Sequence, residues 1–174
     1  KRIDSTLPQL LEAVKLILDS HIGEKGIIHC HTYKIARYLK NNLRDRNHRG
    51  RILIHDHKDR DKVLNEHVIS KKPTVLLSPS MTEGVDLRDD SSRFQIICKV
   101  PYPYLGDKLV KKRMNKFPGW YNLQTAKTII QSAGRSVRNS EDHAVTYILD
   151  SDFQRFFNRN KVLFSKDFKQ CLVM

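Results

Sequence analysis

Short apolar runs alternate with helical stretches along this chain, and this alternation restricts the fold more than any other feature. The expected strands cover residues 26–29, 51–55, 74–78, 94–100 and 144–150, and the expected helices cover 8–20, 32–43, 59–70, 106–117 and 122–138. Such alternation is typical of an α/β fold, in which helices cover both faces of a mostly parallel sheet. Functional residues of these folds gather at the carboxyl ends of the strands.

The size of the chain predicts a single domain. With 174 residues, 39% of them hydrophobic, it can form one good core but is too short for two typical domains. We expect residues 1–174 to form this domain, with a leading helix within 1–22 and a loose tail at 158–174. No apolar run is long enough for a membrane span and no signal-peptide pattern is present, which indicates a cytoplasmic or nuclear protein without a membrane partner. The three scattered cysteines argue against a disulfide framework.

The charge of the chain indicates a polyanionic partner. There are 32 Lys and Arg against 19 Asp and Glu, so the formal net charge is +13. Nucleic acid is the obvious polyanion. A basic surface maintained for solubility is the alternative.

The segment 131–138, with the sequence QSAGRSVR, has the residue types that phosphoryl transfer requires. Gln131, Arg135 and Arg138 fall at i, i+4 and i+7 and would share one face of a helix. The neighbouring face, at 126, 130, 133 and 137, has the apolar spacing that anchors a helix to a core. Two guanidinium groups that stay charged can neutralise a γ-phosphate, and an amide can orient water or a phosphate oxygen. Gly134 is costly inside a helix, so we expect another group to pack against its backbone. The alternative is an exposed helix end, where cations favour the helix dipole.

Two upstream segments complete a recognisable order of motifs. Residues 26–33 read GIIHCHTY, and residues 74–87 run from an apolar strand into the tetrapeptide EGVD at 83–86. Together with 131–138, these segments resemble motifs IV, V and VI of superfamily 2 helicases, and the resemblance is closest to the XPD and DinG branch. VPYPY at 100–104 and RNSED at 138–142 favour that branch. The resemblance covers about residues 26 to 155 and implies a RecA-like fold.

The resemblance also implies roles for individual residues. Arg138 resembles the arginine finger that contacts the γ-phosphate of ATP, with Arg135 and Gln131 as its companions. The positions that would close against the nucleotide are Gly84, Asp86 and Gly134. The hydroxyl residues that resemble contacts to the phosphates of a single strand are Thr32, Ser78, Ser80 and Thr82. Serine and threonine at such places are also common as turn or cap residues, and we expect Thr32 to cap the helix at 32–43.

A second basic region covers residues 108–116 and contains no acid. Lysines followed by Phe117, Trp120 and Tyr121 form a combination suited to single-stranded nucleic acid, and Trp120 is the candidate for stacking on a base. An amphipathic helix with a solvated basic face explains the same region. The histidine-rich runs at 29–31 and 55–57 lack the ligand spacing of a structural zinc site, so we expect no metal site in this chain.

The sequence contains neither a G-x-x-x-x-G-K-S/T phosphate loop nor a D-E-x-H or D-E-x-D metal box. Helicases of this type carry both in a first RecA-like lobe, which would hold ATP and Mg²⁺ and often an iron–sulfur domain. The chain is therefore interpreted as the second lobe of an ATP-dependent DNA helicase, inactive in isolation, with single-stranded DNA and the first lobe as partners. The resemblance is consistent with a role in DNA repair. The alternatives are the equivalent lobe of an RNA helicase and a non-enzymatic nucleic-acid-binding module.

Overall fold

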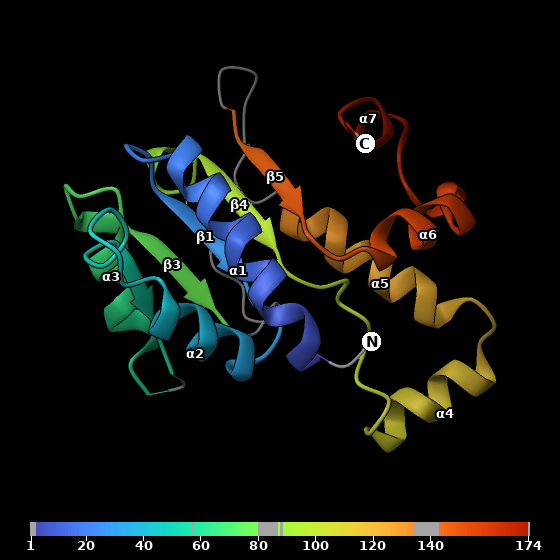
Figure 1. The fold of residues 1–174 in the computed structure, drawn as a ribbon. Coiled ribbons are helices and arrows are strands. Elements are labelled where there is room, and N and C mark those ends of the chain that lie inside the picture. The colour runs from blue at the N-terminus through green and yellow to red at the C-terminus, as the bar shows by residue number, and fades with distance from the viewer. Residues whose placement is uncertain (1–2, 57, 80–86, 88, 134–142, 174) are drawn as a thin grey trace.

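The computed structural model of the protein describes residues 3–173, except 57, 80–86, 88 and 134–142. Its centre is a five-stranded sheet with the strand order β2-β3-β1-β4-β5, in which every neighbouring pair is parallel. The strands are β1 (Gly26–His29), β2 (Ile52–Ile54), β3 (Val75–Ser78), β4 (Phe94–Ile97) and β5 (Val145–Ile148). The predicted α/β class with a mostly parallel sheet is confirmed (Figure 1).

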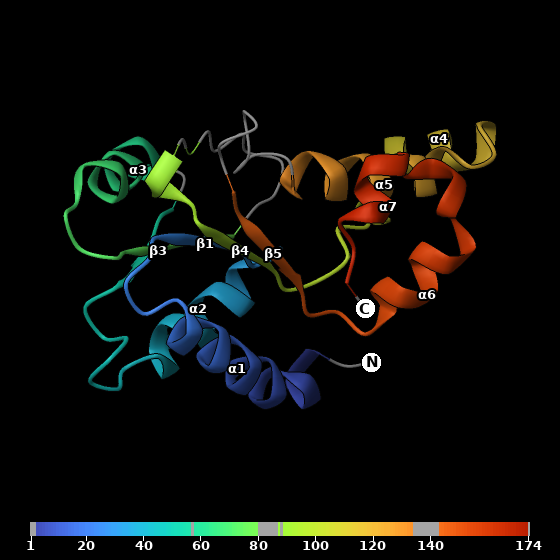
Figure 2. The ribbon, with the colours of Figure 1, turned by 90° about the horizontal axis from the view of Figure 1, so that it is seen from above.

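Helices cover both faces of the sheet (Figure 2). The helices are α1 (Ile3–Ser20), α2 (Tyr33–Asn42), α3 (Arg60–Ile69), α4 (Lys108–Lys116), α5 (Trp120–Ala133), α6 (Asp152–Arg159) and α7 (Lys166–Gln170), with 3-10 turns η1 (Asp89–Ser91) and η3 (Lys161–Leu163). α1 and α2 lie on one face, α3 and α5 lie on the other, and α4, α6 and α7 lie beyond the β5 edge. Within the described ranges, no helix combines the length and apolarity needed to cross a bilayer.

The sheet core is the larger of two main hydrophobic clusters and lies under α1 and α2. Strand residues such as Ile28, Leu77 and Ile96 are completely buried there, against Leu18 of α1 and Leu39 of α2. A smaller cluster on the opposite face joins Ile27 and Leu76 to Val63 of α3. Burial on both faces explains why these strands are continuously apolar rather than alternating.

The aromatic cluster lies beyond β5 and joins α5 to the last part of the chain. Its buried members are Val100, Ala126, Ile129, Phe153, Phe156, Phe157 and Phe164. Phe164 contacts Phe157 and Phe168 with ring centroids 5.1 and 5.0 Å apart. The tail after residue 157 therefore packs through Phe164 and Phe168, which differs from the loose tail expected from the sequence.

The predicted elements agree with the structure in order and type, and the differences lie at their ends. β4 ends at Ile97 rather than at residue 100. α1 begins at Ile3, so Pro8 lies inside the helix rather than at its N-terminal turn. Proline removes one backbone hydrogen bond, but Leu7 and Leu11 on either side of it are buried in the sheet core and hold this turn in place. α5 is described as far as Ala133, and its predicted continuation to 138 lies outside the described residues.

Candidate functional site

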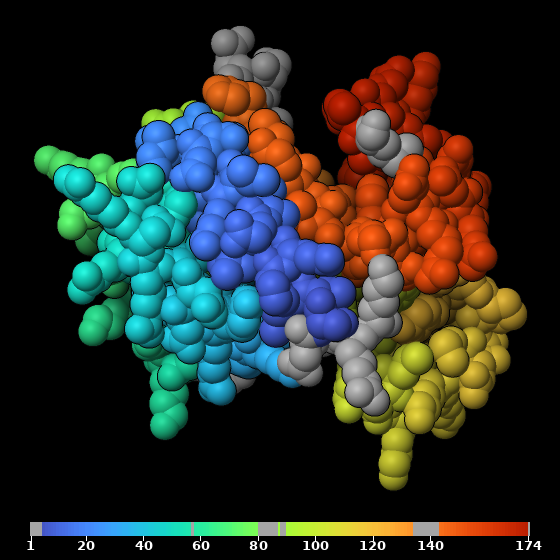
Figure 3. Space-filling model, in the orientation of Figure 1, coloured from blue at the N-terminus to red at the C-terminus, as the bar shows by residue number. Residues whose placement is uncertain are grey.

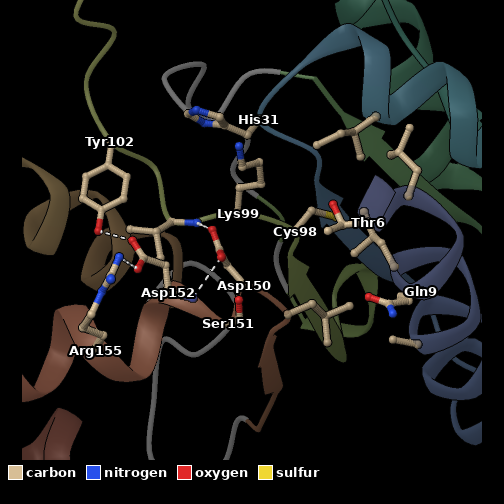
Figure 4. A pocket seen from close by; sticks show the side chains of 16 residues that line it. Thr6, Gln9, His31, Cys98, Lys99, Tyr102, Asp150, Ser151, Asp152 and Arg155 are labelled. Carbon is tan, nitrogen blue, oxygen red and sulfur yellow. Dashed lines mark hydrogen bonds and ion pairs between the residues drawn. The ribbon is translucent and has the colours of Figure 1, made fainter. Parts of the chain in front are cut away.

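The carboxyl ends of the strands lie along one edge of the sheet. His29 is paired with Ser78 and with Ile97, and Ile97 is paired with Ile148. A cleft of about 860 Å³ opens at this edge between α1 and α6, beside the ends of β1, β4 and β5 (Figure 4). The polar residues that line it are Thr6, Gln9, His31, Lys99, Tyr102, Asp150, Ser151, Asp152 and Arg155. This edge is where an α/β fold of this kind binds its ligands.

Thr32 lies directly after β1, at the N-terminus of α2. Its side-chain oxygen accepts a hydrogen bond from the backbone N–H of Ile35 at 3.2 Å, so the predicted cap is confirmed. A capping hydroxyl still has its own proton to donate. Thr32 is half-buried, and its contact with a nucleic-acid strand stays a prediction.

His31 links β1 to this cap in a left-handed conformation, with φ of 66°. Left-handed backbone is uncommon outside glycine and concentrates at functional sites. Burial lowers the pKa of His31 and the nearby Lys99 lowers it further, while Asp150 opposes both. The imidazole is therefore neutral at neutral pH, and Lys99 is the cation on this side of the cleft (Figure 4).

The two carboxylates in the cleft form hydrogen bonds and an ion pair within the protein. Asp150 accepts hydrogen bonds from the backbone N–H of Val100 at 2.9 Å and of Asp152 at 3.0 Å. Asp152 accepts a hydrogen bond from the Tyr102 hydroxyl at 2.8 Å and pairs with Arg155. The hydrogen bond from Tyr102 lowers the pKa of Asp152, so this carboxylate stays ionised. These contacts fix the segment after β4 to the start of α6.

Ser78, at the end of β3, is fully buried. Its carbonyl oxygen accepts a hydrogen bond from the N–H of Cys30 at 2.8 Å, as part of the sheet edge. Ser78 is therefore not exposed in this lobe, and its contact with a nucleic-acid strand stays a prediction.

α5 presents Gln131 to solvent at its carboxyl-terminal end. The opposite side of the helix is buried at Thr125, Ala126, Ile129 and Ser132. The sequence predicted an apolar face at 126, 130, 133 and 137, and the observed face is rotated toward Ile129. Ala126 is buried and the residues at 130 and 133 are half-buried, whereas position 137 lies outside the described residues.

Gln95 is a residue of this region that sequence reasoning missed. It is fully buried in β4, and its Nε2 atom donates to the carbonyl oxygen of Ala133 and to the hydroxyl of Thr146, both at 2.9 Å. The end of α5 is thereby tied to both β4 and β5. The signal in the sequence was a single amide within the apolar strand FQII.

Several predicted site residues lie outside the described part of the chain. They are Gly84, Asp86, Gly134, Arg135 and Arg138 of the nucleotide site, and Ser80 and Thr82 of the strand track. Their roles stay predictions. No group of three or more potential metal ligands comes together among the residues that are described.

The basic helix α4 projects at a corner of the molecule (Figure 3). None of its residues is buried, and Val110 and Met114, which have core spacing, are only half-buried. The Arg113 guanidinium lies 5.8 Å from the ring centroid of Trp120, and the ring itself is half-buried at the start of α5. α4 and Trp120 thus combine exposed cations with an aromatic face.

Comparison with known families decides the identity of this fold. Residues 16–171 match the family model described as the helicase C-terminal domain. The chain belongs to this family. The sequence resembles ATP-dependent DNA helicase YoaA of Haemophilus influenzae, with 26% identity over 84% of this chain, and ATP-dependent DNA helicase CHL1 of Candida albicans, with 28% identity over 59%. It spans 24% and 15% of those two proteins.

Solved structures show the same fold at low sequence identity. A structure of XPD matches 92% of this chain with a TM-score of 0.70 and 16% identity. The match covers 35% of the XPD chain. A structure of Xpd4 of S. tokodaii matches 94% of this chain with a TM-score of 0.63 and 20% identity. The match covers 34% of the Xpd4 chain. The helicase C-terminal domain is therefore a RecA-like lobe of the XPD and DinG type, as the order of motifs predicted.

Proposed function

We propose that this chain is the second motor lobe of an ATP-dependent DNA helicase. The observation that carries the proposal is the family match over residues 16–171, which includes α5 and the segment that follows it. The matched relatives are named as DNA helicases, which favours DNA over RNA and over a non-enzymatic module. The proposed site of action is inside the cell, in the cytoplasm or nucleus.

The proposed contribution to chemistry is charge neutralisation across the cleft between two lobes. Arg138 acts as the arginine finger, Arg135 and Gln131 assist it, and Gly84 and Asp86 close against the nucleotide. ATP and Mg²⁺ are held by a first lobe, and an iron–sulfur cluster, where one exists, belongs to that lobe. Support comes from the exposure of Gln131 on a helix whose other side is buried, since a packed helix holds an exposed polar side chain in one place.

The proposed contribution to DNA binding is part of a track for one strand. Thr32 and Lys99 at the sheet edge, with Ser80 and Thr82, contact phosphates, while α4 and Trp120 supply further cations and a ring for stacking. The net charge of +13 and the exposure of the α4 lysines support this arrangement. Contacts of this kind bind a strand without reading its sequence, as a translocating motor requires.

The test of this proposal is turnover of ATP by the full-length protein. Arg138→Ala should lower kcat by about 10³ to 10⁵, because an arginine finger stabilises charge that develops in the transition state. Arg138→Lys should fail nearly as badly, since a point charge cannot reproduce the planar two-pronged contact. Steady-state hydrolysis measured with and without single-stranded DNA checks both variants.

Arg44→Ala provides the matched control. Arg44 is an exposed arginine after α2 whose guanidinium contacts Asn41 at 3.4 Å, so its loss should leave turnover unchanged. Near-normal turnover by Arg138→Lys would contradict the finger. Hydrolysis by residues 1–174 alone would contradict the two-lobe proposal, because this chain lacks a phosphate loop.

A further inference from the structure

A buried glutamine in the middle of a parallel sheet is unusual. Gln95 is completely inaccessible to solvent, and it pairs with Ile27 of β1 and Thr146 of β5 in the register of the sheet. Burying an amide is unfavourable unless hydrogen bonds replace those it made to water. A leucine would fill the same volume without that penalty. The glutamine therefore provides something that apolar packing would not.

Hydrogen bonds of the Gln95 amide identify what it provides. The Nε2 atom uses both of its protons, one for the carbonyl oxygen of Ala133 and one for the hydroxyl of Thr146. The Oε1 atom is buried and has no partner among the described residues, so the amide is held through its nitrogen alone. The bond to Thr146 of β5 orients the amide plane, and the bond to the Ala133 carbonyl then restrains the end of α5 relative to β4 and β5.

Ala133 is the last residue of α5 that the structure describes, and Arg135 and Arg138 follow it by two and five residues. A displacement of about 1 Å at a group that acts on a transition state can cost about 100-fold in rate. We propose that Gln95 is a positioning residue for ATP hydrolysis: its amide holds the end of α5 against β4 and β5 and so fixes the point from which the two arginines extend. The inference rests on the proposed function of Arg138.

The main test is Gln95→Met in the full-length protein, because methionine keeps the volume and loses the donor. We expect kcat for ATP to fall by about 10-fold to 100-fold. KM for ATP and affinity for single-stranded DNA should change less than about twofold, since the arginines act on the transition state rather than the ground state. Unchanged kcat with folded protein would overturn the inference.

A double-mutant cycle separates positioning from general destabilisation. In a background that lacks both arginines (Arg135→Ala together with Arg138→Ala), Gln95→Met should cause no further loss of turnover, because the groups that Gln95 positions are already absent. The same fractional loss in both backgrounds would show a merely structural role and would overturn the inference. Failure of Arg138→Ala itself to reduce turnover would instead refute the proposed function, so the two failures are distinguishable.

Thr74→Val is the matched control for stability. Thr74 is buried directly before β3, and its hydroxyl is 2.9 Å from Nδ1 of His67 in α3, so the variant loses a buried hydrogen bond that does not involve α5. We expect a comparable fall in melting temperature with unchanged kcat. Loss of kcat by Thr74→Val equal to that of Gln95→Met would overturn the inference.

The pH dependence of turnover by Gln95→Glu provides a further test. Only the protonated acid can donate to the Ala133 carbonyl, and burial favours protonation of a carboxyl group. Turnover by Gln95→Glu relative to the unmodified protein should therefore rise as the pH is lowered from about 8 to about 6. A pH-independent ratio would contradict the requirement for a donor at this position.

Discussion

The sheet core and the aromatic cluster stabilise the protein in different ways. The sheet core is mainly aliphatic and joins α1 and α2 to four neighbouring strands, so it depends on segments from residue 7 to residue 98. The aromatic cluster is built from residues 100–172 and is rich in phenylalanine. α5 lies between them, with Ala126 and Ile129 in the aromatic cluster and its end bonded to Gln95 of the sheet. The sheet core thus holds α1 and α2 on the strands, and the aromatic cluster packs against α5, which precedes Arg135 and Arg138 in the sequence.

Removal of Ile28 should have the largest effect on stability. Ile28 is fully buried in the central strand, where rigid neighbours cannot collapse into a cavity. Ile28→Ala should lower the free energy of unfolding by about 3 to 5 kcal/mol, and both clusters should unfold together. Urea denaturation followed by far-ultraviolet circular dichroism measures the change. Val162→Ala, at a position 90% exposed, is the control, and equal effects of the two variants would contradict the prediction.

Removal of Phe164 tests whether the aromatic cluster can open independently. Phe164 is buried near the end of the chain, where the surrounding segments can rearrange. Phe164→Ala should lower the free energy of unfolding by about 2 to 3 kcal/mol, toward the low end for a buried phenylalanine. Hydrogen exchange should show faster exchange in α7 while protection in β1 persists. Equal loss of protection in α7 and β1 would mean that the two clusters form one cooperative unit.

The smallest effect should come from Trp120, at the outer end of α5. The ring is half-buried and contacts Arg113 of an exposed helix, so Trp120→Ala should change stability little. If a base stacks on the ring, affinity of the lobe for single-stranded DNA should fall by about 1 to 2 kcal/mol. Titration of a labelled oligonucleotide at constant salt checks this, with Leu16→Ala on α1 as an exposed control. Unchanged affinity would make Trp120 a packing residue.

The fold was largely predictable because strands that are buried on both faces appear in the sequence as short, continuously apolar runs. The runs beginning at Gly26, Val75 and Phe94 are apolar, short and followed by helices, and all three form the expected parallel strands. The tail was not predictable in this way. Phe164 and Phe168 are four residues apart, but this short spacing does not show what they pack against, because Phe164 contacts Phe157 of α6 and Phe168 contacts Phe164.

The candidate site was predictable only where a residue acts locally. Thr32 caps the helix that begins at the next residue, so its role as a cap depends on adjacent residues and is confirmed. The burial of Ser78 depends on neighbouring strands, and the role of Gln95 depends on Ala133, which is 38 residues away in sequence. Spacing along the chain carries no information about such pairs.

The buried guanidinium of Arg51 has a consequence for how the fold is assembled. It donates to the carbonyl oxygens of Leu18, His21, Glu24 and Pro73, which are 22 to 33 residues away in sequence. These partners come together only after α1 has docked beside the strands, so the contacts cannot guide the earliest, local steps of folding. Interactions that form after the transition state slow unfolding and leave the folding rate nearly unchanged. We therefore expect Arg51 to stabilise the completed sheet mainly by slowing its unfolding.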